Sequence, residues 1–307
     1  AAKLPTRLVL RGDQRDFDNT LHLAERSREE VNVRYLGKDA GREEDPSGLL
    51  YYVRRAFVDT TRRTLKVEAT MPDSVVVWPP AHPPSLVIVG GETTDENIGK
   101  IRSYARDGGS VLVVLDGPGK AGTLAGLAEV PPFDLTEAHV GRDVILGQIA
   151  FDHRIFAPFA APQFNDFTKI HFWKYRKLAP GKLGEDSRIL ARFESGDPAF
   201  LEKPIGKGRL FVLTSGWNSA DSQLARSSKF VPILMSLTER NGPGPLVGEN
   251  FLVGDRIPIP SLIAGDRTKP PSVRKPDGSR VVSASTDTTF SGTDLPGVYT
   301  LETSTGD

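Results

Sequence analysis

Three carboxylates follow stretches that read as buried β-strands, and they are the side chains best placed for chemistry. Asp13 follows residues 8–10, Glu92 follows residues 86–89 and Asp116 follows residues 111–115. The carboxyl ends of parallel strands meet at one edge of a sheet, where ligands bind and where neighbouring carboxylates can act as an acid–base pair. The commoner interpretation, that these carboxylates cap helices or are solvated, stays open. The ligand site predicted at this edge consists of Gly12, Asp13, Gly91, Glu92, Asp116, Gly117 and Ser215.

Nucleophilic and metal chemistry have little support. The chain contains no cysteine, which excludes a thiolate nucleophile, a disulfide and a zinc–sulfur site. The five histidines show neither His-x-His nor His-Glu-x-x-His spacing, so we expect no metal and no cofactor. A serine triad would need His153 or His171 together with Ser215 or Thr214, but no Gly-x-Ser-x-Gly motif surrounds Ser215. A hydrolase with an unrecognised serine or aspartate nucleophile is kept as a third alternative.

A glycine-rich segment at residues 117–123 (GPGKAGT) invites comparison with a phosphate-binding loop. The motif Gly-x-x-x-x-Gly-Lys-Ser/Thr fails here, because Ala121 follows Lys120 and Val114 occupies the place of the first glycine. The segment is predicted to be a loop at the carboxyl edge of the sheet.

Aromatic side chains offer a candidate partner surface. In residues 169–175, strand alternation would place His171, Trp173 and Tyr175 on one face. Trp and Tyr are frequent in interface hot spots, so Trp173, Tyr175 and Trp217 are predicted to form a recognition patch if they are exposed together. The alternative is that one of the two faces belongs to the core.

Composition limits the partners. Lysine plus arginine and aspartate plus glutamate number 39 each among 307 residues, so no basic field attracts nucleic acid or anionic lipid. No apolar run reaches the ~18 residues of a membrane span, and no signal peptide opens the chain. The abrupt ends predict a soluble piece of a longer protein.

The elements expected around these residues alternate between strands and helices, which is typical of a doubly wound, mainly parallel sheet. Strands are predicted at residues 8–10, 31–35, 65–67, 86–89 and 111–115, with a hairpin at 199–213. Helices are predicted after residues 10, 47, 93 and 228, with Ser47 capping the second and a Thr93–Glu96 capping box starting the third. Residues 1–242 are therefore predicted to form an α/β domain. Beyond a Gly/Pro linker, residues 246–307 are predicted to form a small β-sandwich-like domain.

Several segments carry a resemblance to a known family. They are residues 86–91 (LVIVGG), 104–115 (YARDGGSVLVVL), 151–159 (FDHRIFAPF), 206–214 (GKGRLFVLT), 230–234 (FVPIL) and 293–299 (TDLPGVY). In this order they resemble the class I glutamine-amidotransferase-like (flavodoxin-like) domains of bacterial aerotolerance-type membrane proteins, which have two N-terminal transmembrane helices. The resemblance covers nearly the whole chain.

The resemblance implies a non-enzymatic module on the extracytoplasmic side of a bacterial membrane, tethered through segments outside this sequence. True amidotransferases have a Cys-x-Gly turn after the strand corresponding to residues 111–115, whereas this chain has Leu115 and Asp116 there. The first hypothesis is therefore a catalytically inactive module that binds protein partners in a membrane complex. The alternative is a domain that binds a small, sugar-type molecule at the carboxyl edge of the sheet.

Overall fold

The computed structural model describes residues 7–12, 19–23, 29–61, 63–79, 82–179, 181–239, 251–258, 272–282 and 289–302. The chain divides into two compact units, one made of residues 28–240 and the other of residues 1–27 together with 241–307. The predicted division placed residues 1–27 in the larger domain instead.

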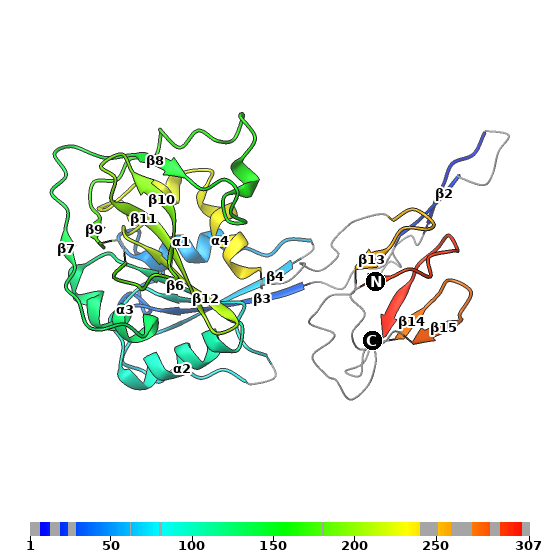
Figure 1. Ribbon diagram of the computed structural model, residues 1–307, viewed down its shortest axis with the longest axis horizontal. Helices are drawn as coiled ribbons and strands as arrows, with labels where there is room; N and C mark the ends of the chain where they lie inside the picture. The colour runs from blue at the N-terminus through cyan, green and yellow to red at the C-terminus, as the bar shows by residue number, and fades with distance from the viewer. Residues whose placement is uncertain are drawn as a thin grey trace. The chain divides into compact units, whose positions relative to one another are not determined.

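The larger unit contains the eight-stranded sheet and four α-helices (Figure 1). Its strands in chain order are β3 (Glu29–Leu36), β4 (Arg63–Thr70), β5 (Leu86–Val89), β6 (Ser110–Val114), β8 (Leu146–Ile149), β10 (Arg188–Phe193), β11 (Pro198–Ile205) and β12 (Gly208–Leu213), with β7 (Thr136–Glu137) and β9 (Arg176–Lys177) forming a separate pair. Its helices are α1 (Leu49–Ala56), α2 (Asp95–Arg106), α3 (Ala121–Ala128) and α4 (Phe230–Thr238), with 3₁₀ turns η1 (Pro118–Lys120), η2 (Ala157–Phe159) and η3 (Leu224–Arg226).

The strand order of the sheet is β4-β3-β5-β6-β12-β11-β10-β8. Strands β4, β3, β5, β6 and β12 are mutually parallel, and β11, β10 and β8 continue the sheet antiparallel. The parallel strands, numbered along the chain, therefore have the order 2-1-3-4-5 of flavodoxin-like doubly wound folds. This confirms the predicted fold class of the α/β domain.

Helices cover both faces of the sheet, as the right-handed crossovers of a doubly wound fold require. The core on one face joins α1 and α4 to sheet residues such as Val33 and Leu112. The core on the other face joins α2 and α3 to residues such as Val87 and Val113. In β5 and β6 every residue is buried, because the central parallel strands are covered on both sides.

The helix starts differ in detail from those predicted. The N-cap of α2 is Thr94, whose side chain accepts from the Asn97 N–H, one residue after the predicted cap. Helix α1 has Gly48 at its N-cap, and Ser47 does not cap it. A distant carboxylate, Asp39, accepts from the Leu50 N–H instead.

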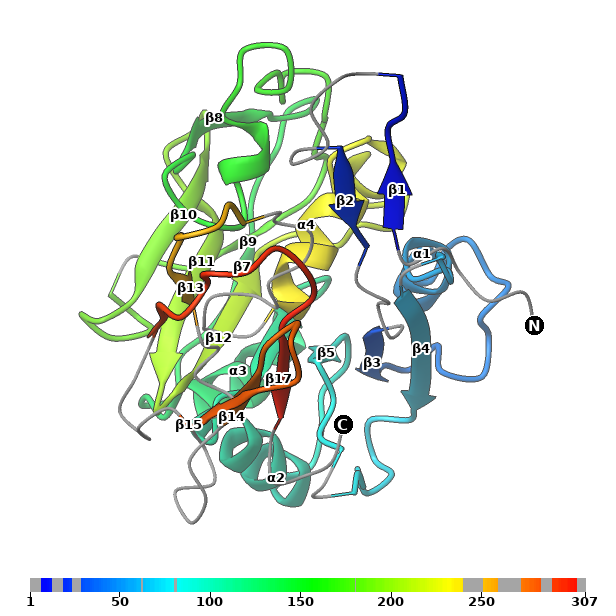
Figure 2. The same ribbon diagram turned by 90° about the vertical axis from the view of Figure 1, so that its right-hand side faces the viewer.

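The N-terminal segment is not part of the sheet, which corrects the prediction that residues 8–10 form its first strand. β1 (Arg7–Val9) pairs antiparallel with β2 (Thr20–His22), as Figure 2 shows in dark blue. All six residues of the pair are exposed, and Leu21, expected on a helix face, lies in β2. A short apolar run followed by Gly-Asp is therefore not enough to identify a central strand, since burial comes from neighbouring elements.

The smaller unit also contains β13 (Ile257–Pro258), β14 (Ser272–Arg274), β15 (Arg280–Val282), β16 (Thr289–Phe290) and β17 (Thr300–Glu302). β15, β14 and β17 form a three-stranded antiparallel sheet, and β13 pairs with β16. The predicted turn at Pro276-Asp277-Gly278 joins β14 to β15, with Gly278 at φ 84°. A complete sandwich stays a prediction, because the described strands form only these small sheets.

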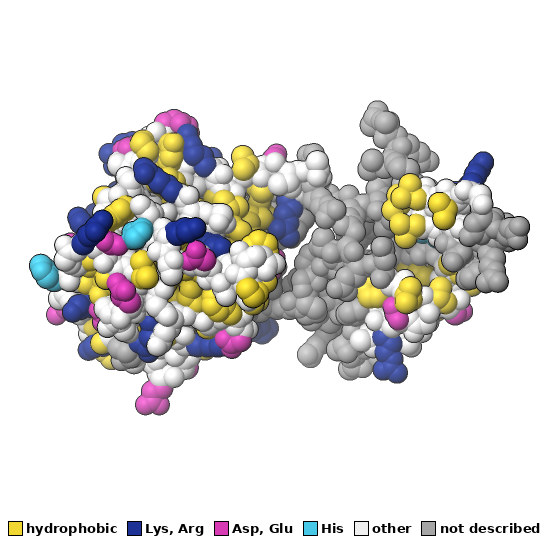
Figure 3. All heavy atoms as spheres, turned by 90° about the horizontal axis from the view of Figure 1, so that it is seen from above, with side chains coloured by type: hydrophobic (Ala, Val, Ile, Leu, Met, Phe, Trp, Pro, Cys, Tyr) yellow, Lys and Arg dark blue, Asp and Glu magenta, His cyan; other side chains and the backbone are white. Residues whose placement is uncertain are grey.

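On the face seen in Figure 3, lysine and arginine side chains of the larger unit are interspersed with aspartates and glutamates. The described surface on this face therefore shows no extended basic field, in keeping with the net charge of zero.

Candidate functional site: a polar cavity at the carboxyl edge of the sheet

A cavity of about 300 Å³ opens where the parallel strands end. Its lining comes from the segments that follow β3, β5, β6 and β12. β3 and β5 are the neighbouring strands between which the order of the flavodoxin-like sheet reverses, and ligands of such folds bind outside this switch point. We call this space the polar cavity. It is lined by Tyr35, Lys38, Asp39, Arg42, Asp45, Ser47, Gly48, Leu49, Gly90, Gly91, Glu92, Asp116, Gly117, Gly119, Lys120 and Asn218.

Asp39 fixes the wall that follows β3. One carboxylate oxygen accepts from the Tyr35 hydroxyl at 2.6 Å, and the other accepts from the Leu50 N–H at the start of α1 at 2.8 Å. Burial, followed by the charge of Asp39, raises the pKa of Tyr35 well above its ordinary value, so this phenol stays a donor. The negative charge of this carboxylate near the N-terminus of α1 also interacts favourably with the helix dipole. Asp39 is therefore a structural residue that shapes the cavity.

Glycines let the backbone approach this hydrogen-bonded pair. A Cβ on Gly90 would lie 2.6 Å from the Tyr35 hydroxyl, and a Cβ on Gly48 would lie 2.5 Å from an Asp39 oxygen. Both contacts are shorter than real Cβ atoms make, so any other residue would displace the pair. The glycine at position 90, after β5, is therefore required by this close packing against Tyr35.

Lys120 holds together the ends of β5 and β6. Its ammonium donates to the carbonyl oxygens of Gly90 at 2.5 Å and Val114 at 2.9 Å, and it forms an ion pair with Asp116. Burial lowers the pKa of Lys120, and the charge of Asp116 opposes that shift. All three donors of the ammonium are thus directed to protein oxygens. This arrangement is unlike that of a phosphate-binding loop, whose lysine reaches the ligand.

A second buried ion pair lies behind Asp116. Arg176 donates to the carbonyl oxygen of Leu115 at 3.0 Å and pairs with Asp221, whose carboxylate also accepts from the Gly216 N–H at 3.0 Å. Burial raises the pKa of Asp221, and Arg176 opposes this shift. These contacts fix the segment after β12 against the end of β6.

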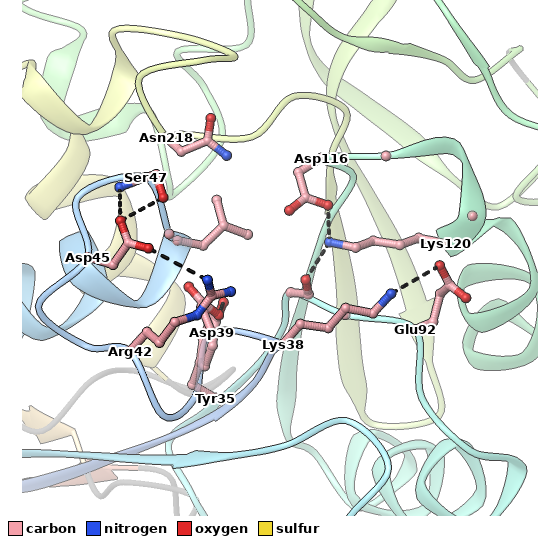
Figure 4. Close-up of a pocket in the computed structure, with 16 residues that line it drawn as sticks. Tyr35, Lys38, Asp39, Arg42, Asp45, Ser47, Glu92, Asp116, Lys120 and Asn218 are labelled. Carbon is pink, nitrogen blue, oxygen red and sulfur yellow. Dashed lines mark hydrogen bonds and ion pairs between the residues drawn. The ribbon is translucent and has the colours of Figure 1, made fainter.

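Two polar side chains that line the cavity, Asp116 and Asn218, have atoms that can form further hydrogen bonds. One oxygen of Asp116 pairs with Lys120, while the other has no hydrogen-bond partner among the described residues. The Asn218 side-chain oxygen accepts from the N–H groups of Ala220 and Asp221, which leaves its amide hydrogens without a partner in the described part of the chain. Figure 4 shows Asn218 and Asp116 on one side of the cavity, with Arg42, Asp39 and Lys38 on the other.

Four of the predicted site residues meet at this cavity: Gly91, Glu92, Asp116 and Gly117. Gly12 lies after β1, outside the sheet, and Asp13 lies outside the described residues. Ser215 is fully buried, and its hydroxyl donates to the carbonyl oxygen of Lys174 at 2.7 Å, so it does not line the cavity.

No serine triad forms in the part of the chain that the structure describes. His153 lies 3.3 Å from Glu202, His171 pairs with Asp143, and neither contacts Ser215. The same described ranges contain no group of three or more histidine or acidic residues that could hold a metal.

The predicted aromatic surface is not formed. Tyr175 is 3% exposed and Trp217 is 1% exposed, while Trp173 is half-buried. The alternation expected for residues 169–175 fails because this segment is not a regular strand: only Phe172 makes isolated bridges, to Val144 and Ser222. Tyr175 and Phe172 both pack against Phe193 in the core.

The sequence reasoning missed the whole wall that follows β3, from Tyr35 to Leu49, together with Lys120 and Asn218. A signal for the wall existed, since residues 37–48 form a charged, glycine-containing run (GKDAGREEDPSG) directly after a strand. Counting residues 8–10 as the first strand of the sheet placed Gly12 and Asp13 in the predicted ligand site instead.

No protein-family profile and no curated protein matches the chain. Solved structures with similar folds include two cytoplasmic proteins of Salmonella typhimurium. One is 16% identical with a TM-score of 0.46, and the match covers 68% of this chain and 98% of that one. The other is 13% identical with a TM-score of 0.47 and the same coverage. A ThuA-like protein from Bacteroides uniformis is 10% identical with a TM-score of 0.44, over 71% of this chain and 92% of that one. With TM-scores below 0.5, the fold is assigned from the strand order of this chain itself.

The extracytoplasmic location implied by the resemblance is corrected. The two Salmonella proteins are described as cytoplasmic, which conflicts with that location. Of the helices in the described ranges, none has the length and hydropathy of a membrane span. The narrower resemblance to aerotolerance-type proteins stays a prediction.

Proposed function

We propose that the 28–240 unit is a non-catalytic binding domain for a small, hydroxyl-rich molecule such as a monosaccharide. The observation that carries this proposal is the polar cavity at the switch point, with donors and acceptors interleaved around it. A hydroxyl group both donates and accepts, so it is matched by such a lining. The free oxygen of Asp116 would accept from the ligand, and the amide of Asn218 would donate to it.

The size of the cavity supports a ligand of this class. About 300 Å³ corresponds to the liquid volume of roughly ten waters at ~30 Å³ each. A monosaccharide fits that volume, whereas a dinucleotide does not. The backbone around the cavity is already held in place by Lys120 and Asp39, so few side chains have to become ordered when a ligand binds.

Three features favour binding over catalysis. The chain has no cysteine, so the amidotransferase nucleophile is absent. Among the described non-glycine residues only Glu129 has a positive φ, so neither Leu115 nor Asp116 adopts a left-handed strained turn at the nucleophile position. The ammonium of Lys120 contacts three protein oxygens, which leaves it no donor for a substrate.

Protein–protein interaction, the other function predicted from the sequence, stays a prediction. The surface that motivated it is largely buried, because Tyr175 and Trp217 belong to the core. No described feature takes its place.

The test is ligand-observed NMR on the full chain with a panel of neutral monosaccharides, for the wild type and Asp116→Asn. We expect at least one sugar to bind and the variant to weaken it about tenfold, because a charged acceptor is lost. Asp152→Asn is the matched control. Asp152 is exposed, follows the edge strand β8, pairs with Arg188 and does not line the cavity.

The proposal fails if the folded chain binds no sugar of the panel, or if Asp116→Asn binds as tightly as the wild type. Glutaminase or esterase activity that disappears in Asp116→Ala or Ser215→Ala would overturn its non-catalytic part.

A further inference from the structure

The charged groups of the polar cavity are sorted by depth. The side chains of Lys38 and Arg42 are 71% and 66% exposed, whereas those of Asp116 and Lys120 are 29% and 7% exposed. Figure 4 shows Lys38 and Arg42 along one side of the cavity, across from Asp116 and Asn218. The mouth of the cavity thus carries the accessible cations Lys38 and Arg42 together with Glu92, whose side chain is 54% exposed, and a free carboxylate oxygen of Asp116 lies deeper.

These two cations are more loosely paired than their neighbours. Lys38 lies 3.9 Å from Glu92 and Arg42 lies 3.9 Å from Asp45, which is beyond hydrogen-bond distance. In the same region, Arg54 and Arg55 of α1 lie 2.6 and 2.9 Å from Glu43 and Glu44. Of the cations that line the cavity, Lys38 and Arg42 are therefore the ones left with donors to offer a ligand, whereas the donors of Lys120 contact protein oxygens.

We propose that the ligand is a sugar acid, whose single carboxylate is held by Arg42 and Lys38 while its hydroxyl groups contact Asp116 and Asn218. This inference rests on the proposed function and specifies its ligand. The planar guanidinium of Arg42 matches a carboxylate with two parallel N–H···O bonds, and Lys38 adds a second positive charge beside it.

The lining favours one negative charge over two. The cavity carries the cations Lys38, Arg42 and Lys120 and the carboxylates Asp39, Asp45, Glu92 and Asp116, which is an excess of one negative charge. A phosphate dianion would add two negative charges to this excess, whereas the carboxylate of a sugar acid adds only one. The N-terminus of α1, the natural place for a phosphate, is already contacted by Asp39 through the Leu50 N–H.

The experiment measures, by titration calorimetry on the full chain at low ionic strength, the affinities of glucuronate, glucose and glucose 6-phosphate. We expect glucuronate to bind about tenfold more tightly than glucose, since it gains a charge-assisted contact. Arg42→Gln is expected to weaken the binding of glucuronate about tenfold and that of glucose by much less, and so to remove the preference. Arg55→Gln, which removes a neighbouring tightly paired arginine, is the matched control and is expected to change neither affinity.

Equal binding of glucose and glucuronate would overturn the sugar-acid inference and leave the proposed function standing. Tighter binding of glucose 6-phosphate than of glucuronate would also overturn it, in favour of a phosphorylated ligand. If none of the three binds to the folded chain, the inference and the proposed function fail together. A preference for glucuronate that survives in Arg42→Gln, or that is lost in Arg55→Gln, would reject the assignment of these residues.

Discussion

Two cavities in the same α/β unit differ in size and in polarity. The polar cavity, of about 300 Å³, opens at the carboxyl edge of the sheet. A second cavity, of about 30 Å³, lies between the sheet and α4 and is lined only by apolar side chains, among them Phe172, Trp217 and Leu234. We call it the apolar cavity. Its volume is that of about one water, but its lining side chains offer a water no hydrogen-bond partner. Polar side chains gather at the ends of the strands, where backbone N–H and C=O groups need hydrogen-bond partners. The middle of the sheet is covered by helices, and there only apolar side chains pack.

The comparison also explains why aromatic residues misled the sequence reasoning. Trp217 follows β12 by four residues, close in sequence to Asn218 of the polar cavity, yet its ring packs on Phe230 and its indole N–H donates to the carbonyl oxygen of Leu49 at 2.9 Å. Two adjacent residues thus line different cavities. Hydrophobicity alone does not tell a hot-spot tryptophan from a core one.

The largest expected effect comes from enlarging the apolar cavity. Trp217→Ala should lower the free energy of unfolding by about 4 kcal/mol, because it removes a buried aromatic ring. Urea denaturation of the full chain measures this, with the transition of the larger unit followed by circular dichroism. Trp173→Ala, at a half-buried position, is the control and should cost clearly less. Equal losses for the two variants would contradict the assignment of Trp217 to the core.

A slightly smaller effect is expected from removing the charge at the floor of the polar cavity. Lys120→Met should lower the free energy of unfolding by about 3 kcal/mol, since it leaves Asp116 without its cation and two carbonyl oxygens without their donor. The measurement is again urea denaturation, and the control is Lys66→Gln, an exposed position on the edge strand β4. If the double variant Lys120→Met, Asp116→Asn lost as much as the sum of the single changes, the two residues would not be coupled.

The smallest of these effects should come from Tyr35→Phe, which removes one hydrogen bond to Asp39. We expect a loss of about 2 kcal/mol at neutral pH, because a bond to a charged acceptor is lost. Since the folded state raises the pKa of Tyr35, the folded chain keeps this proton above pH 10 while the unfolded chain loses it. Its contribution to stability is therefore complete below the unfolded pKa of about 10 and decreases as the pH rises further.

Stability measured between neutral pH and pH 11 tests this sign. The wild type should lose stability more steeply above pH 10 than Tyr35→Phe does, so that the two curves converge. Tyr52→Phe, at a half-buried position on α1, is the control. Parallel curves for the wild type and Tyr35→Phe would show that Tyr35 is not held protonated by the fold.

The sequence by itself determined the elements whose signals are local. Continuous apolar runs identified β5 and β6, because strands covered on both faces are almost entirely apolar. The spacing of Ile98, Ile101 and Tyr104 identified the buried face of α2, and Gly108, at φ 111°, ends that helix as predicted. Glu92 and Asp116 were placed at one edge of the sheet because parallel strands end together.

Only the tertiary structure decided which strand begins the sheet, and with it where the switch point lies. Residues 8–10 and 31–35 both read as strands, but only the second has neighbours on both sides in the sheet. The contacts that build the polar cavity, from Asp39 to the Leu50 N–H and from Lys120 to Gly90, join residues 11 and 30 positions apart. No periodicity encodes such pairs, because they depend on where the strand ends meet in space.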